Sequence, residues 1–230
     1  MHEVDLMSDQ YKFKNPLSLC LWVKRLMWIH IIVSFALLVS LTWELKVLKD
    51  FQGGVFSDQA TFLKALELPT QIIAYLAIVF LIIFLGGGII VFKWIKEANI
   101  NVRALGAKDL SFTPGWAVGW FFIPVANLFK PFKVMNEIWS ASHSPENWQQ
   151  DEKNRAVQKW WGLWIGSNGL IQLSNNFEKK ADSMDKIIQL SYINIGGEVL
   201  WILLCLSFIS LVRQISTAQV ESFSQISEQE

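Results

Sequence analysis

Two ionisable residues, His30 and Glu198, lie inside otherwise apolar runs of this chain. A carboxylate in the middle of a bilayer is costly unless it is paired, hydrated or protonated, and an imidazole changes its charge near neutral pH. Counted from the predicted cytoplasmic ends of their segments, both residues lie roughly 20 Å deep, so they are able to meet. Two interpretations stay open: a proton- or ion-responsive pair, and separate hydrogen bonds that only join helices.

Three asparagines extend this predicted polar site. Asn168 and Asn194 also fall in apolar segments, and Asn127 lies in a tryptophan-rich stretch described below. Polar side chains in lipid-spanning helices commonly bond to neighbouring helices. We therefore include all three asparagines as candidate members of an intramembrane polar site.

Motifs for other chemistry are absent from the sequence. It holds no G-x-S-x-G, H-E-x-x-H, Walker or C-x-x-C motif, so we expect neither an enzyme nor a catalytic residue. His143 has no second ligand at useful spacing, and Cys20 and Cys205 lie in apolar runs typical of reduced thiols. We expect no metal site and no cofactor. A formal net charge of zero gives no sign of nucleic-acid binding.

The composition indicates a membrane protein. Of the 230 residues, 52% are hydrophobic and 17% are charged, whereas soluble domains carry about a quarter charged residues. Twelve Trp against three Tyr is also unusual, and Trp favours membrane interfaces. Since a span needs roughly 20 helical residues, we predict four spans, at about 17–43, 69–94, 157–173 and 187–212.

The remaining segments are polar and divide the chain around one membrane domain, residues 17–212. We expect residues 1–16 to be a cytoplasmic N-terminal segment rather than a cleaved signal, and residues 213–230 to be a frayed cytoplasmic tail. Pro69 is expected at the first helical turn of the second span, after a short helix at 57–66.

The distribution of charge predicts the orientation. With the N-terminus inside and 115–130 not crossing, six of the 20 Lys and Arg lie outside: Lys46, Lys49, Lys64, Lys179, Lys180 and Lys186. The other 14 lie inside, which obeys the positive-inside rule. If 115–130 did cross, this bias would weaken without vanishing. We therefore predict cytoplasmic N- and C-termini in a cytoplasmic membrane.

The stretch at residues 113–142 fits neither a loop nor a span. Its apolar part, 115–129, extends roughly 22 Å as a helix, which is short of a ~30 Å core. Pro124 predicts a break in the helix, because proline cannot donate to the carbonyl of Trp120, and Asn127 is a candidate partner for that carbonyl. After Pro131, an amphipathic helix is expected, with Phe132, Met135, Ile138 and Trp139 on its apolar stripe and Glu137 and Ser140 off it. A re-entrant hairpin lining a site and an interfacial wedge both fit.

The same region carries a family resemblance. The runs NVRALGA (101–107) and FTPGWAVGWFFIPVANLFKPFKVMNEIWSAS (112–142), followed by Trp148 and WWGLW (160–164), resemble the bacterial membrane-protein family called domain of unknown function 4328. The resemblance covers roughly residues 70–212. The residues that carry it are Asn101, Gly106, Pro114, Gly115, Trp116, Pro124, Asn127, Pro131, Glu137 and Trp139. It implies a multi-span helical membrane protein and no particular activity.

The expected fold is an all-α integral membrane protein with four transmembrane helices and a Pro-broken re-entrant or interfacial segment. The leading functional hypothesis is a non-enzymatic membrane component that contacts the lipid bilayer, a membrane-protein partner or further copies of itself. The glycines at 86–88, 162, 166, 196 and 197 would allow such close contacts. The alternative is a small transporter or channel using Glu198 and His30.

Overall fold

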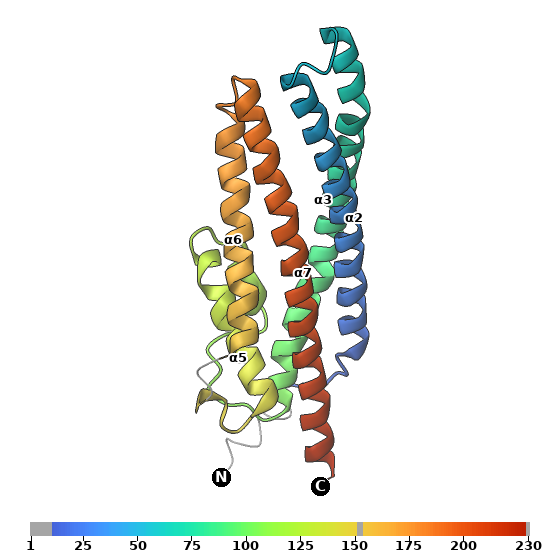
Figure 1. Cartoon of the computed structure of the whole chain (residues 1–230). Helices are drawn as coiled ribbons and strands as arrows, with labels where there is room; N and C mark the ends of the chain where they lie inside the picture. Colours follow the sequence, from blue (N-terminus) through green and yellow to red (C-terminus); the bar gives the residue numbers. More distant parts are fainter. Residues whose placement is uncertain (1–10, 151–153, 229–230) are drawn as a thin grey trace. The chain divides into compact units, whose positions relative to one another are not determined.

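The computed structural model describes residues 11–150 and 154–228, and this part of the chain is helical without any strand. Figure 1 shows the long helices α2, α3, α6 and α7. Their bounds are Leu17–Gln52, Gln59–Ala104, Arg155–Glu178 and Met184–Ser227. The short elements are α4 (Trp116–Gly119), η1 (Trp120–Phe122), η2 (Ala126–Leu128), α5 (Lys130–His143) and η3 (Trp148–Gln150). The predicted all-α class is confirmed.

The chain divides into two compact units. Unit 1 comprises residues 1–26, 86–161 and 207–230, and unit 2 comprises residues 27–85 and 162–206. Each long helix contributes one part to each unit. The beginning of α2, the end of α3, the beginning of α6 and the end of α7 therefore all belong to unit 1.

Three described helices are long and apolar enough to cross a membrane: α2, α3 and α7. The prediction of four spans was wrong, because the segment predicted at 157–173 belongs to α6, which does not qualify. This helix has 24 residues, and its length is sufficient. Its sequence is too polar, since Ser167, Asn168, Gln172 and Ser174 interrupt the apolar run.

Two predicted boundaries also differ from the structure. Pro69 lies inside α3 rather than at its first turn, because the expected short helix at 57–66 joins the span without a break. The tail after residue 212 is helical through Ser227 rather than frayed. Its apolar residues explain this, since Ile215 and Ala218 are buried in unit 1. Residues 1–10, part of the predicted N-terminal segment, lie outside the described residues.

Unit 2 has a small core where the turns between its helices meet. Leu45, Leu48, Phe62 and Ile188 are buried together, and Phe51 stacks on Phe62 with ring centroids 4.0 Å apart. Many of its other apolar side chains are exposed, among them Ile78 (57%), Ile82 (65%) and Leu85 (62%) of α3. Exposed apolar surface of this extent is typical of helices that face lipid.

Unit 1 has a larger core with polar members. Trp94, Met135, Ile138 and Leu211 are fully buried, and the Trp94 indole N–H donates to Ser216 Oγ at 3.1 Å. Helix α5 packs its apolar side into this core. Unit 1 therefore combines a packed core with buried polar contacts, and it also contains every residue of the family-like motif.

Candidate functional site

The Pro–Trp segment, residues 111–129, is a series of tight helical turns in unit 1. Thr113 accepts a hydrogen bond from the Trp116 amide at 3.4 Å, where α4 begins. Helix η1 ends at Phe122, and Ile123 is extended before Pro124, so the expected break occurs. Val125 then takes a φ of 67°, a left-handed conformation that is strained for a β-branched residue. This turn starts η2 and directs the chain into α5.

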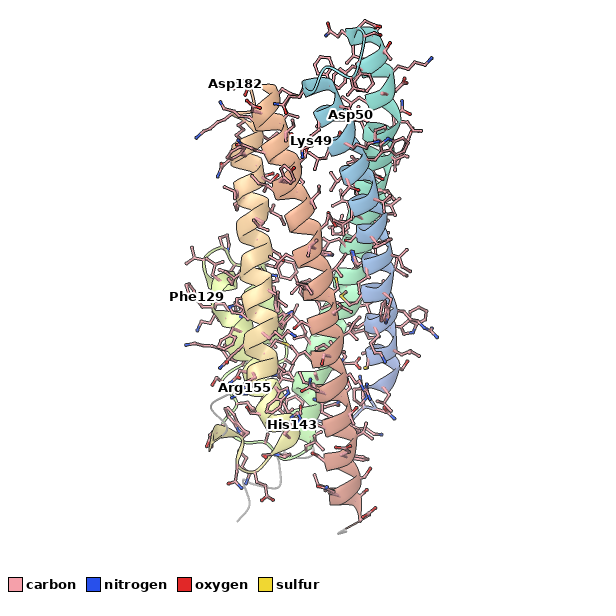
Figure 2. All side chains as sticks on the ribbon, in the orientation of Figure 1. Lys49, Asp50, Phe129, His143, Arg155 and Asp182 are labelled. Carbon is pink, nitrogen blue, oxygen red and sulfur yellow. The ribbon has the colours of Figure 1, made fainter. Side chains whose placement is uncertain are left out.

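The outer side of this segment is apolar and uncovered in the described structure. Trp116, Phe122, Val125 and Phe129 have exposed fractions of 52%, 67%, 72% and 61%. Figure 2 labels Phe129, at the end of the segment and directly before α5. Large exposed apolar side chains beside the basic residues Lys130 and Lys133 are typical of a membrane interface.

The inner side of the segment is held by Glu137 of α5. Its carboxylate accepts hydrogen bonds from the backbone amides of Ser111 (2.7 Å) and Phe112 (3.3 Å). The Phe112 carbonyl in turn accepts from Arg103 Nη2 at 2.8 Å and from Asn99 Nδ2 at 3.2 Å. Residues 111 and 112 are thus fixed from both sides by charged or polar side chains.

Burial sets the electrostatics of Glu137. Glu137 is only 5% exposed, and this burial raises the pKa of its carboxyl group above the ordinary value. The amides of Ser111 and Phe112 and the nearby Arg103 charge act in the opposite direction, without cancelling the effect of burial. Glu137 therefore binds a proton more readily than an exposed glutamate does.

A cavity of about 750 Å³ lies between the segment and α5. Its lining is aromatic and polar, and it includes two lysines: Ser111, Phe112, Thr113, Trp116, Trp120, Lys130, Phe132, Lys133, Asn136, Glu137, Ser140, Trp148 and Gln149. Lys130 Nζ lies 5.0 Å from the Trp120 ring and 5.7 Å from the Phe112 ring. This cavity combines positive charge with aromatic walls.

A buried amide network lies in the same unit as the cavity. Asn101 exchanges two hydrogen bonds with the backbone of Lys14 (3.0 and 2.8 Å) and donates to Gln219 Oε1 at 3.0 Å. Gln219 Nε2 donates to the Ala98 carbonyl and to Ser142 Oγ, both at 3.0 Å. The network joins the N-terminal segment, α3, α5 and α7 within unit 1.

The structure brings His30 and Glu198 into the same surroundings in unit 2. The Glu198 carboxylate faces Ser34, one helical turn beyond His30. The centroid of the His30 ring lies 5.9 Å from that of Trp201 and 5.0 Å from that of Phe80. Four polar atoms here have no hydrogen bond of good geometry within the described structure: His30 Nδ1, Ser34 Oγ, Glu198 Oε2 and Trp201 Nε1.

The three candidate asparagines do not join this group. Asn127 lies in unit 1, where its backbone N–H donates to the Ile123 carbonyl (2.9 Å) and its side-chain oxygen has no partner in the described structure. Asn168 donates to Trp164 of its own helix at 2.8 Å. Asn194 accepts from Ser174 at 2.6 Å, which joins α6 to α7. The predicted set is thus four separate features: the His30/Glu198 group and the three asparagines, each with its own surroundings.

Glu137, Ser140 and Gln219 were underestimated from the sequence. Glu137 and Ser140 were placed off the apolar stripe of α5, yet both are buried. Gln219 was assigned to a frayed tail, yet it is fully buried. Only the occurrence of Glu137 in the family-like motif pointed toward it.

Comparison with known proteins adds one finding. A family model described as Domain of unknown function (DUF4328) matches residues 58–217, more than half of the chain. This match confirms the resemblance drawn from the motif residues. No curated protein and no solved structure matches the chain. Among the described residues, no group of three or more His, Cys, Asp or Glu side chains is arranged to hold a metal ion.

Proposed function

The chain belongs to the DUF4328 family, and we propose that it is a non-enzymatic, multi-pass protein of a bacterial cytoplasmic membrane that acts through contacts with lipids or with a protein partner. In this proposal α2, α3 and α7 cross the bilayer, and the Pro–Trp segment lies at the cytoplasmic interface as a wedge. The family description assigns no function, so the proposal depends on the chain itself.

One observation carries this proposal. The Pro–Trp segment exposes Trp116, Phe122, Val125 and Phe129 although unit 1 has a well-packed core, and two lysines follow directly in sequence. Exposing these side chains to water is unfavourable, whereas the interface of a bilayer is a favourable environment for both the aromatic rings and the cations. Glu137 of α5 also fixes residues 111 and 112, so the beginning of the segment is held against α5.

The depth of single side chains tests the proposal. Cys20 and Cys205 are free and buried, so both are first replaced by alanine, and a fluorophore is attached at Phe122→Cys or Val125→Cys. Nitroxide-labelled lipids should quench both positions strongly. A label at Ser144→Cys, beyond the end of α5, should be quenched little. Equal quenching at all three positions would refute the interfacial wedge.

Contact with a partner or a second copy is the other part of this proposal. A Cβ added at Gly86, Gly196 or Gly197 would meet no atom within 4 Å, whereas one at Gly166 would meet Leu200 at 3.1 Å. The first three glycines are therefore open to another helix, and Gly166 already packs inside the chain. Gly86→Leu should reduce assembly measured by light scattering in detergent, and Gly115→Leu should not. An unchanged mass for Gly86→Leu would count against this contact.

A second candidate function uses the polar atoms around His30 and Glu198 that have no hydrogen bond of good geometry in the described structure. Buried polar groups normally have partners, so this set suits a water or proton pathway rather than hydrogen bonds between helices alone. Proton flux in proteoliposomes, read with an enclosed pH dye, should be lost in Glu198→Gln and retained in the exposed control Glu178→Gln. The absence of wild-type flux, or its persistence in Glu198→Gln, would exclude this function.

A further inference from the structure

We propose that the cavity between the Pro–Trp segment and α5 binds the phosphate head group of an anionic phospholipid, with Lys130 and Lys133 as its anion-binding residues. This inference rests on the proposed interfacial position of the segment and adds a ligand class to it. The argument follows from the charges, the walls and the opening of the cavity.

The cavity carries an excess of positive charge. Lys130 and Lys133 are three residues apart on α5, so their side chains lie on one face. In the described part of the chain, neither ammonium group has a carboxylate partner within 4.0 Å. Glu137 also lines the cavity, but both of its oxygens accept backbone amides. Its carboxylate is thereby occupied with the segment and leaves the lysines free for a ligand.

The position of Lys130 is fixed by its aromatic neighbours. Its ammonium group lies over the rings of Trp120 and Phe112, and the Phe112 backbone is held by Glu137 and Arg103. A contact with a ring face uses the charge of a lysine but leaves its N–H donors available. Lys130 is thus oriented before a ligand arrives, which reduces the entropy cost of binding an anion.

The walls suit the part of a lipid that adjoins its phosphate. Trp116 and Trp120 pack with ring centroids 4.9 Å apart, and Trp120 Nε1 is a buried donor without a partner in the described structure. An indole offers an apolar face together with one hydrogen-bond donor, which matches the ester and glycerol region of a bilayer. The volume of about 750 Å³ accommodates a head group and the start of its chains.

The opening favours an amphiphile over a soluble anion. Trp116 lines the cavity and is 52% exposed, and the exposed side chains of Phe122, Val125 and Phe129 continue the same segment. Acyl chains leaving the cavity along these side chains would cover apolar surface that a free phosphate ion leaves bare. The ligand class is therefore a lipid.

The test uses the full-length chain purified in detergent and titrated with phosphatidylglycerol or phosphatidylcholine, with bound lipid counted by native mass spectrometry. We expect preference for phosphatidylglycerol and its loss, by about tenfold or more, in Lys130→Gln/Lys133→Gln. The matched control is Lys93→Gln/Lys96→Gln, which removes two exposed charges of unit 1 that do not line the cavity. An equal loss in both double variants would overturn the proposal, because general attraction would explain the preference.

Two further arms keep the result interpretable. Asn136→Trp fills the cavity while both lysines remain, so it should also abolish the preference; retained binding would refute the cavity as the site.

Millimolar glycerol 3-phosphate should not displace the lipid, and full displacement would refute the lipid class. If the double variant fails to fold, Lys133→Gln alone serves, since this side chain is exposed. If the unsubstituted protein shows no preference for phosphatidylglycerol while quenching at Phe122 is normal, this inference is rejected and the proposed function stands.

Discussion

At the scale of single residues, Glu137 is the side chain on which the candidate site depends most. It holds residues 111 and 112 through two backbone amides, yet burial raises its pKa. A raised pKa means that the folded state binds this proton more tightly than the unfolded state does. The contribution of Glu137 to stability is therefore fully present below the ordinary value of 4.5 and is lost as the pH rises through the raised pKa.

Glu137→Gln should remove this pH dependence. The wild-type melting temperature should decline from pH 4 upward relative to that of the variant, because ionisation of the buried carboxyl is unfavourable. The variant should also be less stable by about 1–3 kcal/mol, since an amide group cannot accept from both backbone donors. Thermal unfolding in detergent across this pH range measures both effects. Glu146→Gln, at an exposed site, is the control; a wild-type slope unchanged in Glu137→Gln would contradict the assignment.

Gln219 should matter for stability far more than its place near the chain end suggests. Gln219→Leu removes the N–H donor that Ser142 Oγ accepts and leaves one N–H of Asn101 without its acceptor in a buried site, which should cost about 1–3 kcal/mol. Gln214→Leu removes only a hydrogen bond to Ser210 at the surface and should change little. Denaturant unfolding of the two variants gives the comparison, and equal stability would show that the network contributes nothing.

The residue scale is where prediction from sequence was weakest. The apolar position of His30 and Glu198 was visible, because a charge inside an apolar run stands out. The buried roles of Gln219 and Asn101 were not, since these two partners are 118 residues apart and a polar residue on an amphipathic helix resembles a surface residue. The buried role of Glu137 was not predictable either, because its partners are backbone amides, which carry no sequence signal.

At the scale of elements, the helices were predictable and their ends were less so. Lipid-facing segments must satisfy their backbone groups internally, so the long apolar runs correctly indicated helices. Pro124 correctly indicated a break, because the ring removes a donor and blocks the preceding turn. The predicted number of spans was wrong because of α6, which is long enough to cross a bilayer but has polar residues in its middle. The predicted start of the second span was wrong because Pro69 is tolerated within α3.

The end of α3 depends on a glycine. Gly106 has a φ of 91°, and directly after it the Ala107 amide bonds back to the Val102 carbonyl at 3.0 Å, as in a glycine-terminated helix. Gly106→Ala should lower the stability of the protein by roughly 1–2 kcal/mol. Gly115→Ala is a matched control, because a Cβ meets no atom within 4 Å at either site and Gly115 has an ordinary φ of −71°. Equal melting temperatures for the two variants would show that the left-handed turn is not needed.

At the scale of the whole molecule, the division into units constrains the topology. Asn15, Ser111, Ser144 and the end of α7 all belong to unit 1. Helix α2 has 36 residues and is about 54 Å long, more than the thickness of a bilayer core. A crossing α2 therefore separates Asn15 from the turn at Gly54.

Cysteine labelling in intact cells should reflect this topology. On the cysteine-free background, Asn15→Cys, Ser111→Cys and Ser144→Cys should all be protected from an impermeant reagent, and Gly54→Cys should react. Position 144 is chosen because Ser142, two residues earlier in α5, is buried and would react poorly from either side. Opposite behaviour of positions 111 and 144 would show that the Pro–Trp segment crosses the membrane.

The stacking of Phe13 on Phe223, with ring centroids 4.2 Å apart, has a consequence for synthesis. Unit 1 is assembled from the first and last described residues of the chain, so its core cannot close until α7 has left the ribosome. Until Gln219 is synthesised, the Asn101 side chain lacks this partner and is able to form non-native contacts. Unit 2, whose core joins α2, α3 and the start of α7, can form earlier. During synthesis, the unit that carries the family-like motif should therefore be the last part of the protein to fold.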